Sequence, residues 1–351
     1  MQAIEQRNAA ILGKNEEKPT ARRITERDVM VMPTEGIRHA DSLLHAGGVC
    51  FQPAEAPNAG AASLSPAAKY AGARSVLVGL IGSGIQASRT PAMHEREGAE
   101  QGLRYIYKLI DLDELRIGPE ALPELVTAAR RMGFAGLNIT YPCKQAVIPL
   151  LDELTPDAQA LGAVNTVVFR DGRSIGCNTD WWGFAESFKR ELADVARDRV
   201  IQFGAGGAGA AVAHALLTLG VGQLRIVDTD AGRAERLATE LCTRFGSERA
   251  IPEGDLEKAL SDANGVVNTT PVGMAKYPGM PLPAHLLHPA LWVADIIYFP
   301  LETQLLRTAR GIGCRTMGGG GMAVFQAVGA FRLFTGVEPD SERMRQHFQS
   351  M

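Results

Sequence analysis

From about residue 76 onward, short runs of β-branched and aliphatic residues alternate with longer stretches of helical spacing. The runs at 76–81, 105–111 and 137–140 have the length and composition of buried strands, whereas 122–132 has the apolar spacing of a helix. This alternation is typical of an α/β domain with a largely parallel sheet.

The middle of the chain contains a hairpin pattern. We expect helical runs at 145–151 and 153–160, and then an alternating strand at 164–169. Asp171-Gly172 signals a tight turn after that strand. The second hairpin strand should end at Asn178-Thr179-Asp180, just before a helix that begins near Trp181.

A second α/β pattern begins at 199–203, which reads as a strand followed directly by a glycine-rich turn. An apolar helix is expected at 210–219, and a second strand at 223–227 ends in Asp228. The glycines in this context predict a dinucleotide site in which pyrophosphate approaches backbone N–H groups at a helix start. The turn contains four glycines: Gly204, Gly206, Gly207 and Gly209.

Two further strands are expected at 265–268 and 292–297, and a long helix at 322–334. We therefore predict an α/β protein of two domains. The first α/β pattern covers 73–185, and a Rossmann-type dinucleotide-binding domain comprises 190–317. Residues 1–72 contain few large apolar residues and are predicted to be a disordered leader.

Composition narrows the class of protein. The chain has 351 residues, of which 46% are hydrophobic and 21% charged, and its formal net charge is −3. This balance favours neither nucleic acid nor membrane partners, and no apolar run approaches the length of a membrane span. The five cysteines show no paired spacing, which fits a cytoplasmic protein without disulfides or a metal site.

Two charged residues follow predicted strands in the first half. Lys144 lies just past the strand at 137–140, and ligand chemistry gathers at the carboxyl ends of such strands. Asp180 is either a helix N-cap or the partner of an ion pair that positions the lysine amine.

Ser88 and Thr90 would share one face of an extended segment, where two hydroxyls can donate to a carboxylate. Spacing alone favours the other interpretation, in which these hydroxyls are loop caps ahead of the helix expected at 92–101.

Asp228 bears on the choice of cofactor. Its carboxylate can accept hydrogen bonds from the adenosine ribose hydroxyls of NAD and would repel the 2′-phosphate of NADP. Arg233 is the one nearby feature that argues for NADP, and we interpret it as an exposed helix residue. The sequence therefore favours NAD, with NADP the less favoured cofactor.

Several segments in this order resemble the shikimate/quinate dehydrogenase family over roughly residues 76–348. They are GLIG at 79–82, SRTPAMHE at 88–95, GLNITYPCK at 136–144, GAVNTVV at 162–168, NTD at 178–180, GAGGAG at 204–209, NTTPVGM at 268–274, DIIYFPLET at 295–303 and FQAVGAFRLFTG at 325–336. The resemblance implies an NAD-dependent oxidoreductase that reversibly oxidises quinate to 3-dehydroquinate, shikimate to 3-dehydroshikimate, or both.

The same resemblance implies that the C-terminal stretch returns to the first domain, so that 73–185 plus 318–351 form a catalytic, substrate-binding domain with a cleft between it and the Rossmann-type domain.

The resemblance also implies roles for individual residues. Lys144 and Asp180 would be the catalytic pair. The substrate-binding residues would be Ser88, Thr90, Thr140, Asn165, Tyr298 and Gln326, and the loop at 268–274 with Thr269 and Met274 would face the cofactor. Many shikimate-specific members have serine at both hydroxyl positions, so Thr90 resembles the quinate-active branch.

Two other interpretations remain open. The substrate could be an aminoshikimate or another cyclitol acid, and a silent NAD-binding sensor could keep the fold without the chemistry. Methylene-tetrahydrofolate dehydrogenases share a related plan, but the Ser88/Thr90 segment and the Asp180 stretch do not suit them. The expected partner is a small hydroxylated cyclohexane carboxylate, and the expected assembly is a monomer or homodimer.

Overall fold

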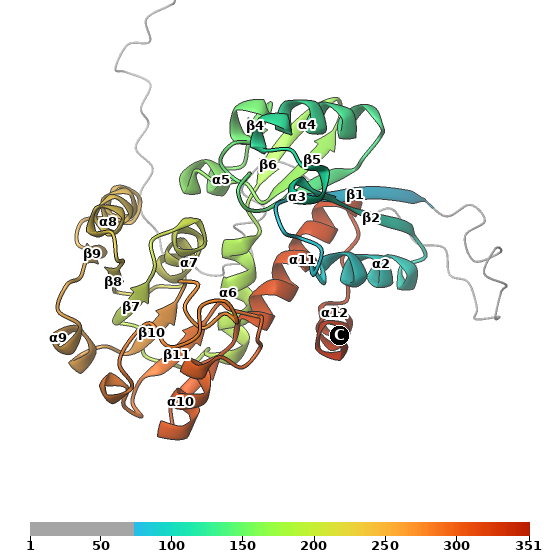
Figure 1. Cartoon of the computed structure of the whole chain (residues 1–351). Helices are drawn as coiled ribbons and strands as arrows, with labels where there is room; N and C mark the ends of the chain where they lie inside the picture. Colours follow the sequence, from blue (N-terminus) through green and yellow to red (C-terminus); the bar gives the residue numbers. More distant parts are fainter. Residues whose placement is uncertain (1–73) are drawn as a thin grey trace, which may run out of the picture. The chain divides into compact units, whose positions relative to one another are not determined.

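The computed structural model describes residues 74–351, whose helices and strands are labelled in Figure 1. The leader predicted over 1–72 lies outside the described residues. Within residues 74–351 the chain is an α/β protein with two six-stranded sheets, as the alternating pattern predicted. No helix of this part is long and apolar enough to cross a membrane.

The first sheet is mixed. Strand β1 runs parallel to β2 and β3, whereas β5 is antiparallel to both β3 and β6. The hairpin between β5 and β6 turns at Asp171 and Gly172, which both have positive φ, as the sequence predicted. In sheet order, the strands are β2 (Arg104–Asp111), β1 (Ser75–Gly82), β3 (Gly136–Ile139), β5 (Thr166–Arg170), β6 (Arg173–Cys177) and β4 (Glu153–Leu154).

Four α-helices and two 3₁₀ turns accompany the first sheet. They are α2 (Thr90–Glu100), α3 (Leu112–Leu115), η2 (Pro119–Ala121), α4 (Leu122–Arg131), η3 (Ile148–Leu150) and α5 (Pro156–Leu161).

Two helical predictions in this half are wrong. The stretch 145–151 forms turns and the short η3, because Pro149 has no N–H to extend a helical ladder. The stretch 153–160 begins instead with β4, and α5 starts only after Thr155, whose hydroxyl caps the helix by accepting from Ala158 N. Thr155-Pro156 is the cap signal that the apolar spacing concealed.

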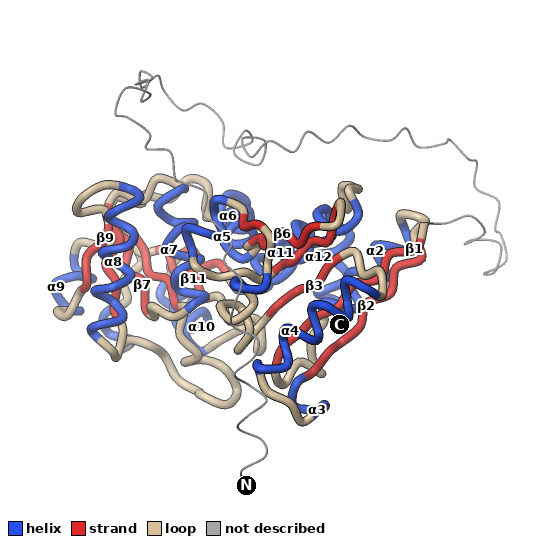
Figure 2. The backbone as a smooth tube through the Cα atoms, turned by 90° about the horizontal axis from the view of Figure 1, so that it is seen from above, coloured by secondary structure: helices blue, strands red, loops and turns tan. Residues whose placement is uncertain are grey.

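The second sheet is entirely parallel, with the order β12-β11-β10-β7-β8-β9. Its chain order reverses between β7 and β10, so the carboxyl ends of these two strands form the switch point at which dinucleotides bind in such sheets. The tube drawing in Figure 2 shows these strands alternating with helices. The strands are β7 (Arg199–Phe203), β8 (Gln223–Val227), β9 (Ala250–Pro252), β10 (Gly265–Asn268), β11 (Trp292–Asp295) and β12 (Arg315–Met317).

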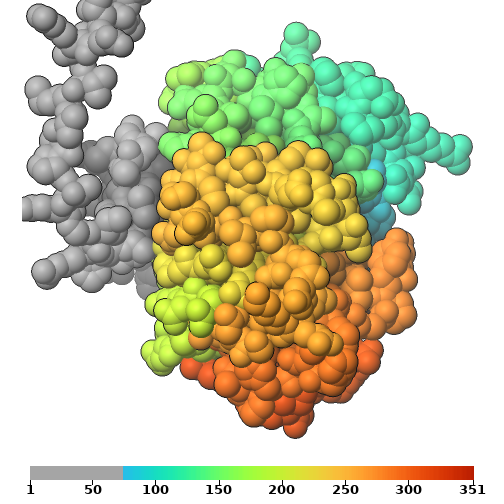
Figure 3. All heavy atoms as spheres, turned by 90° about the vertical axis from the view of Figure 1, so that its left-hand side faces the viewer, coloured from blue at the N-terminus to red at the C-terminus, as the bar shows by residue number. Residues whose placement is uncertain are grey.

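The helices of the second half are α7 (Gly207–Thr218), α8 (Ala231–Phe245), α9 (Leu256–Ser261), η4 (Ala284–Leu286) and α10 (Gln304–Ile312). Residues coloured yellow and orange, which include α8 and α9, form much of the face seen in Figure 3. Helix α7 lies in a core with Val200, Leu224 and Ile226, which explains why its sequence is apolar on nearly every side.

Three helices connect and close the described chain: α6 (Asp180–Glu191), α11 (Gly319–Thr335) and α12 (Ser341–Ser350). Helix α11 packs along α6, and Gly183 allows a close approach, since a Cβ there would lie 2.7 Å from the Gln326 backbone nitrogen. Helix α12 is held to α2 by Arg343, whose Nη2 lies 2.7 Å from the buried Glu97 carboxylate. Helices α11 and α12 therefore pack against the half of the molecule that contains the first sheet.

Candidate active site and cofactor site

Lys144 and Asp180 form an ion pair, with the lysine Nζ 2.6 Å from Asp180 Oδ2. Lys144 comes from the turn after β3, and Asp180 is the first residue of α6. Asp180 does not cap that helix, because Thr179 occupies the N-cap position and Asp180 N itself donates to Asn178 Oδ1. Of the two interpretations open from sequence, the structure has the ion pair.

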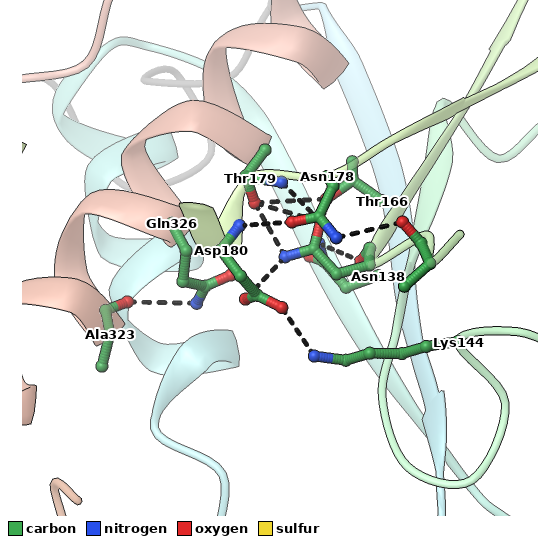
Figure 4. A network of polar contacts seen from close by, with 10 residues as sticks. Asn138, Lys144, Thr166, Asn178, Thr179, Asp180, Ala323 and Gln326 are labelled. Carbon is green, nitrogen blue, oxygen red and sulfur yellow. Dashed lines mark hydrogen bonds and ion pairs between the residues drawn. The ribbon is translucent and has the colours of Figure 1, made fainter. Parts of the chain in front are cut away.

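The other carboxylate oxygen of Asp180 accepts a hydrogen bond from Asn165 Nδ2 at 2.8 Å. In Figure 4 Lys144 reaches Asp180 from below, whereas the buried polar residues lie above the carboxylate. The side chains of Lys144 and Asp180 are 28% and 14% exposed, whereas Asn165 is buried. The pair thus has one face held by the protein interior and one accessible face where a substrate hydroxyl can meet the amine.

Sequence reasoning missed several polar side chains behind this pair. Asn138 lies in β3, Thr166 begins β5 and Thr179 precedes α6, and all three are buried. They hydrogen-bond to one another or to Asn165. The available signal was a polar residue in each of two strands otherwise read as apolar, since a buried polar group needs a partner.

Gln326 and Tyr298 lie beside the pair. In Figure 4 Gln326 projects next to Asp180, and its Nε2 donates to Ala323 O at 3.0 Å. Burial raises the pKa of the Tyr298 phenol, the Lys144 charge opposes that increase, and the Asp180 charge adds to it. Tyr298 is therefore within electrostatic reach of both residues, although 48% of its surface is exposed, and its substrate role stays a prediction.

Ser88 and Thr90 occupy the turn into α2, but the segment is not extended. Arg89 has helical dihedral angles, Thr90 is the first helical residue, and Thr90 N donates to Ser88 Oγ at 3.4 Å. The expected sharing of one extended face is therefore wrong, as is the helix start at Ala92. Pro91 in the first turn explains the earlier start, since its fixed φ suits a helix and its missing N–H costs nothing there.

The turn before Ser88 lies beside the turn that carries Lys144. Thr140 N donates to Ile81 O, and Ser83 N donates to Tyr141 O, each at 2.9 Å. Thr140 therefore sits at the junction of the two turns. Among residues 74–351, no hydrogen bond joins Ser88, Thr90 or Thr140 to the Lys144–Asp180 pair, so their substrate roles remain predictions.

Asp111, which sequence reasoning did not single out, holds the turn that leads to Ser88. Its carboxylate accepts from Gly84 N and Ile85 N, each at 3.0 Å. Burial raises the pKa of this carboxyl, but the hydrogen bonds from Gln86, Ile85 and neighbouring N–H groups outweigh it and leave the pKa below its usual value. An aspartate at the end of β2 thus acts as a fixed anchor for the substrate-side turn.

The glycine turn after β7 is built by backbone geometry. Gly204 has φ +100°, and a Cβ on Gly209 would collide with Gly204 O. A Cβ on Gly206 or Gly207 would meet nothing within 4 Å, so the turn is tight underneath and open above. Helix α7 starts from Gly206 without a side-chain cap, which leaves its first N–H groups oriented toward the open side.

Asp228 closes the same turn from β8. Its Oδ2 accepts from Ala205 N at 2.8 Å, and its Oδ1 lies 3.0 Å from Arg233 Nη2. Burial raises the pKa of Asp228, but N–H donors from Asp230 and Ala205 and the Arg233 charge hold the net pKa below its usual value. Arg233 is half-exposed and also paired with Asp228, so our interpretation of it as a simple exposed helix residue is incomplete.

The loop after β10 faces this turn across the switch point. Thr269 Oγ1 donates to Phe203 O at 2.7 Å and Gly204 O at 2.9 Å, and Met274 is exposed. Beneath the loop, Asn268 Nδ2 donates to the buried Asp295, which also accepts from Thr303. Burial raises the pKa of Asp295 to about 6, against its hydrogen bonds.

These residues fit a dinucleotide. An uncapped helix start can receive pyrophosphate, two glycines leave room for it, and a carboxylate ends the second strand. Within residues 74–351, no group of three or more His, Cys, Asp or Glu side chains is placed to hold a metal ion. The Cys143 thiol beside Lys144 is buried, and burial raises its pKa. A dinucleotide-binding sheet joined to a lysine–carboxylate pair defines the class of NAD(P)-dependent dehydrogenases.

Comparisons with known proteins define the family. The shikimate dehydrogenase substrate binding domain family matches residues 80–167, and the shikimate 5'-dehydrogenase C-terminal domain family matches residues 319–347. The chain is 64% identical over 272 residues to shikimate dehydrogenase (NADP(+)) of Streptomyces avermitilis, covering 77% of this chain and 94% of that protein. It is 52% identical over 280 residues to quinate/shikimate dehydrogenase (NAD(+)) of Corynebacterium efficiens, covering 79% and 99%.

Among solved structures, quinate dehydrogenase from Corynebacterium glutamicum in complex with NAD has a TM-score of 0.77 and 48% identity, covering 79% of this chain and all of that chain. The chain belongs to the shikimate/quinate dehydrogenase family. It is an oxidoreductase of the CH–OH group that uses NAD or NADP, with the shikimate or quinate/shikimate dehydrogenase activity of that family.

Proposed function

We propose that this enzyme prefers NAD and reversibly oxidises both quinate and shikimate at one ring hydroxyl. The observation that carries the catalytic part is the Lys144–Asp180 ion pair of 2.6 Å, partly exposed at the end of β3. In this proposal residues 73–185 and 318–351 bind the substrate, and residues 190–317 bind the dinucleotide.

Lys144 transfers the proton. An alcohol cannot release hydride while it keeps its hydroxyl proton, so a group beside the oxygen must accept that proton as the carbonyl forms. A dinucleotide held at the glycine turn after β7 would supply the hydride acceptor. In oxidation the Lys144 amine takes the hydroxyl proton while Asp180 holds the amine in place, and in reduction the ammonium returns it.

The substrate-binding roles are those that the family resemblance implies. Asn165 donates to Asp180 and Thr140 lies at the start of the Lys144 turn, and we propose that both residues meet ring hydroxyls. Tyr298 and Gln326 approach the pair from the second half of the chain. Ser88 and Thr90 would hold the carboxylate at the end of β1, although their hydroxyls are presented from a helix start and not from an extended segment.

Asp228 supports NAD. A 2′-phosphate within about 5 Å of this carboxylate would cost on the order of 3 kcal/mol per charge at an effective dielectric near 20, before salt screening. The N–H donors that keep the Asp228 pKa low also keep it ionised at neutral pH. Gly204, Gly206, Gly207 and Gly209 would cradle the pyrophosphate of either cofactor, with Thr269 and Met274 across from them.

NADP preference is the second candidate, and Arg233 is the observation that favours it. This half-exposed guanidinium could leave Asp228 and meet a 2′-phosphate, and the relative from Streptomyces avermitilis is an NADP-dependent enzyme. Against it, such a move would leave the Asp228 carboxylate without its cation beside an added dianion. We therefore place NAD first.

Thr90 supports quinate as a true substrate by resemblance alone. The enzymes from both Corynebacterium species, at 52% and 48% identity, are named for quinate. Quinate presents its carboxylate from a tetrahedral carbon, and we propose that threonine at this position suits that geometry.

The test is a matrix of initial rates with quinate and shikimate, each with NAD and NADP. We expect turnover of both acids and a kcat/KM at least about tenfold higher with NAD. Equal values for the two cofactors would refute the NAD preference, and a shikimate rate without any quinate rate would refute the quinate assignment. Turnover of neither acid would favour an aminoshikimate, another cyclitol acid or a non-catalytic role.

A further inference from the structure

Asp180 is held at both of its oxygens. Lys144 contacts one oxygen, and the Asn165 amide nitrogen donates to the other at 2.8 Å. The position of the carboxylate therefore depends on which way the Asn165 amide points. If that amide were reversed, its oxygen would face the carboxylate and repel it.

The orientation of Asn165 is set by its own oxygen. That oxygen accepts from Thr179 N at 2.7 Å and from the Thr166 hydroxyl at 3.0 Å. The Thr166 hydroxyl has one hydrogen and donates it to Asn165, so toward any other neighbour its oxygen can only accept a hydrogen bond. There it meets Asn138 Nδ2 at 3.0 Å.

Asn138 continues the same donor-to-acceptor direction one residue further from Asp180. Its Nδ2 also donates to Asn165 O at 3.2 Å, and its Oδ1 accepts from the Tyr107 hydroxyl at 2.7 Å. Every donor from Tyr107 onward thus points toward Asp180. Figure 4 shows Asn138 and Thr166 at the buried end of this network and Asp180 with Lys144 at the other end.

Tyr107 is suited to begin such a chain. It lies in β2, is 6% exposed, and its ring is held edge-on by His94 with 5.0 Å between ring centroids. Burial raises the pKa of its phenol well above the usual value, so the hydroxyl keeps its proton across the working pH range.

We propose that Tyr107 is a positioning residue for the reaction: its hydroxyl sets the donor direction of the chain Tyr107–Asn138–Thr166–Asn165, and so aims an amide N–H at Asp180. Tyr107 touches neither substrate nor cofactor in this proposal. The role rests on the proposed proton transfer by Lys144, because it matters only if the Lys144–Asp180 geometry limits catalysis.

Loss of the hydroxyl would leave the buried Asn138 oxygen without its donor. The Asn138 amide could then reverse, and the Thr166 hydroxyl would turn toward Asn138. The Asn165 side-chain oxygen would lose one of its three donors, which are the Thr166 hydroxyl, Thr179 N and the Thr179 hydroxyl. Because the Asn165 amide would then be directed less firmly at Asp180, we expect Tyr107→Phe to lower kcat on the order of tenfold, which corresponds to about 1.4 kcal/mol of activation free energy.

Tyr105→Phe is the matched control. Tyr105 lies two residues away on the same strand, is 7% exposed, and its hydroxyl contacts His94 Nδ1 at 2.9 Å, outside the chain. We expect it to keep kcat within about twofold of wild type, whatever it does to thermal stability. Both variants should keep the KM for NAD within about twofold.

A second pair of variants covers the case in which Tyr107→Phe does not fold. Thr166→Val removes the hydroxyl from the middle of the chain, whereas Thr166→Ser keeps it. We expect the valine variant to lose kcat as Tyr107→Phe does, and the serine variant to recover most of it. The double variant Tyr107→Phe/Thr166→Val should be little worse than either single one, because both break the same chain.

The experiment measures kcat and KM for these purified enzymes with the acid that wild type turns over fastest, alongside their melting temperatures. Wild-type turnover tests the proposed function, and the ratios among variants test the positioning role, so the two can fail separately. A folded Tyr107→Phe enzyme with kcat within twofold of wild type would overturn the inference. Equal losses in the Tyr107→Phe and Tyr105→Phe enzymes would also overturn it, as would a Thr166→Ser enzyme no better than Thr166→Val.

Discussion

The catalytic pair and the glycine turn are built in opposite ways. Around Asp180, side chains orient side chains: Lys144, Asn165 and Thr166 are linked by hydrogen bonds between 2.6 and 3.0 Å. Around Gly204, the backbone itself shapes the site, through a positive φ at Gly204 and a close contact between Gly209 and Gly204. The first site depends on which functional groups are present, and the second on which side chains are missing.

This difference predicts how each site fails. A substitution in the first site should lower the rate of chemistry and leave the fold and cofactor affinity largely intact. In the second site, adding a methyl group should weaken cofactor binding or the fold while the proton-transfer groups stay in place.

The largest effect is expected at Lys144. Lys144→Ala removes the group that takes the proton, and lost acid–base catalysis usually costs about 10²–10⁴ in kcat. The KM for NAD should change far less. Lys189→Ala, which removes a lysine paired with Glu186 on α6, is the control and should leave kcat unchanged. A folded Lys144→Ala enzyme that keeps more than about a tenth of kcat while chemistry limits turnover would make Lys144 only a binding residue.

In the second half of the chain, Asp295 is held by side-chain hydrogen bonds from Asn268 and Thr303. We expect its ionisation to change the free energy of unfolding with pH. Its pKa is raised from 3.8 to about 6, so the folded state binds the proton more tightly than the unfolded state. Its contribution to the free energy of unfolding is present below about pH 4 and is lost as the pH rises to about 6. The loss is on the order of 3 kcal/mol.

The measurement compares denaturation of wild type and Asp295→Asn from pH 4 to 8. The variant has no carboxyl to ionise there, so its stability relative to wild type should increase between pH 4 and 6 and stay level above that. A constant difference across the range would show that Asp295 titrates in the folded protein as it does in the unfolded chain.

Gly209 and Gly206 separate the two functions of the glycine turn. Gly209→Ala places a methyl group against Gly204 O, so we expect it to lower stability by about 1–3 kcal/mol and weaken NAD binding as well. Gly206→Ala meets nothing in the protein and has φ −76°, so it should keep the melting temperature and raise only the KM for NAD, on the order of tenfold. If both variants melted alike, the distinction between the tight and open sides of the turn would be lost.

The smallest effect is expected at Asp228. Asp228→Ala removes the charge that disfavours a 2′-phosphate and frees Arg233, so the ratio of kcat/KM for NAD over NADP should fall by about tenfold. Arg233→Ala should leave that ratio at or above the wild-type value. A ratio that stays unchanged in Asp228→Ala would assign cofactor choice to other residues.

The regular parts of the fold and the cofactor turn could be predicted from sequence because their signals are local. The strand at 199–203, the glycines after it and Asp228 lie in one continuous stretch with a known geometric purpose. The helix predicted at 145–151 failed because one proline outweighed apolar spacing, and the start of α5 was misplaced because the cap at Thr155 was not weighed.

The catalytic site could be predicted only in part. Lys144 and Asp180 were found as charged residues after strands, and the structure brings them together. The hydrogen-bonded residues behind them were not found, because Asn138, Thr166 and Tyr107 are ordinary strand residues until the sheet brings Tyr107 to Asn138, and Asn138 to Thr166 and Asn165. The role of Arg233 was likewise predicted incompletely, since its ion pair with Asp228 forms only when Arg233 is in the first turn of α8, close to the end of β8.

The most direct test of the central claim is a double-variant cycle on the catalytic pair. If Lys144 and Asp180 act as one proton-transferring unit, Lys144→Ala and Asp180→Asn should each lower kcat strongly, and the enzyme with both changes should be little slower than Lys144→Ala alone. The measurement is kcat for all four enzymes under conditions where chemistry limits turnover. Losses that multiply in the double variant would contradict the account, because they would mean that the two residues contribute independently.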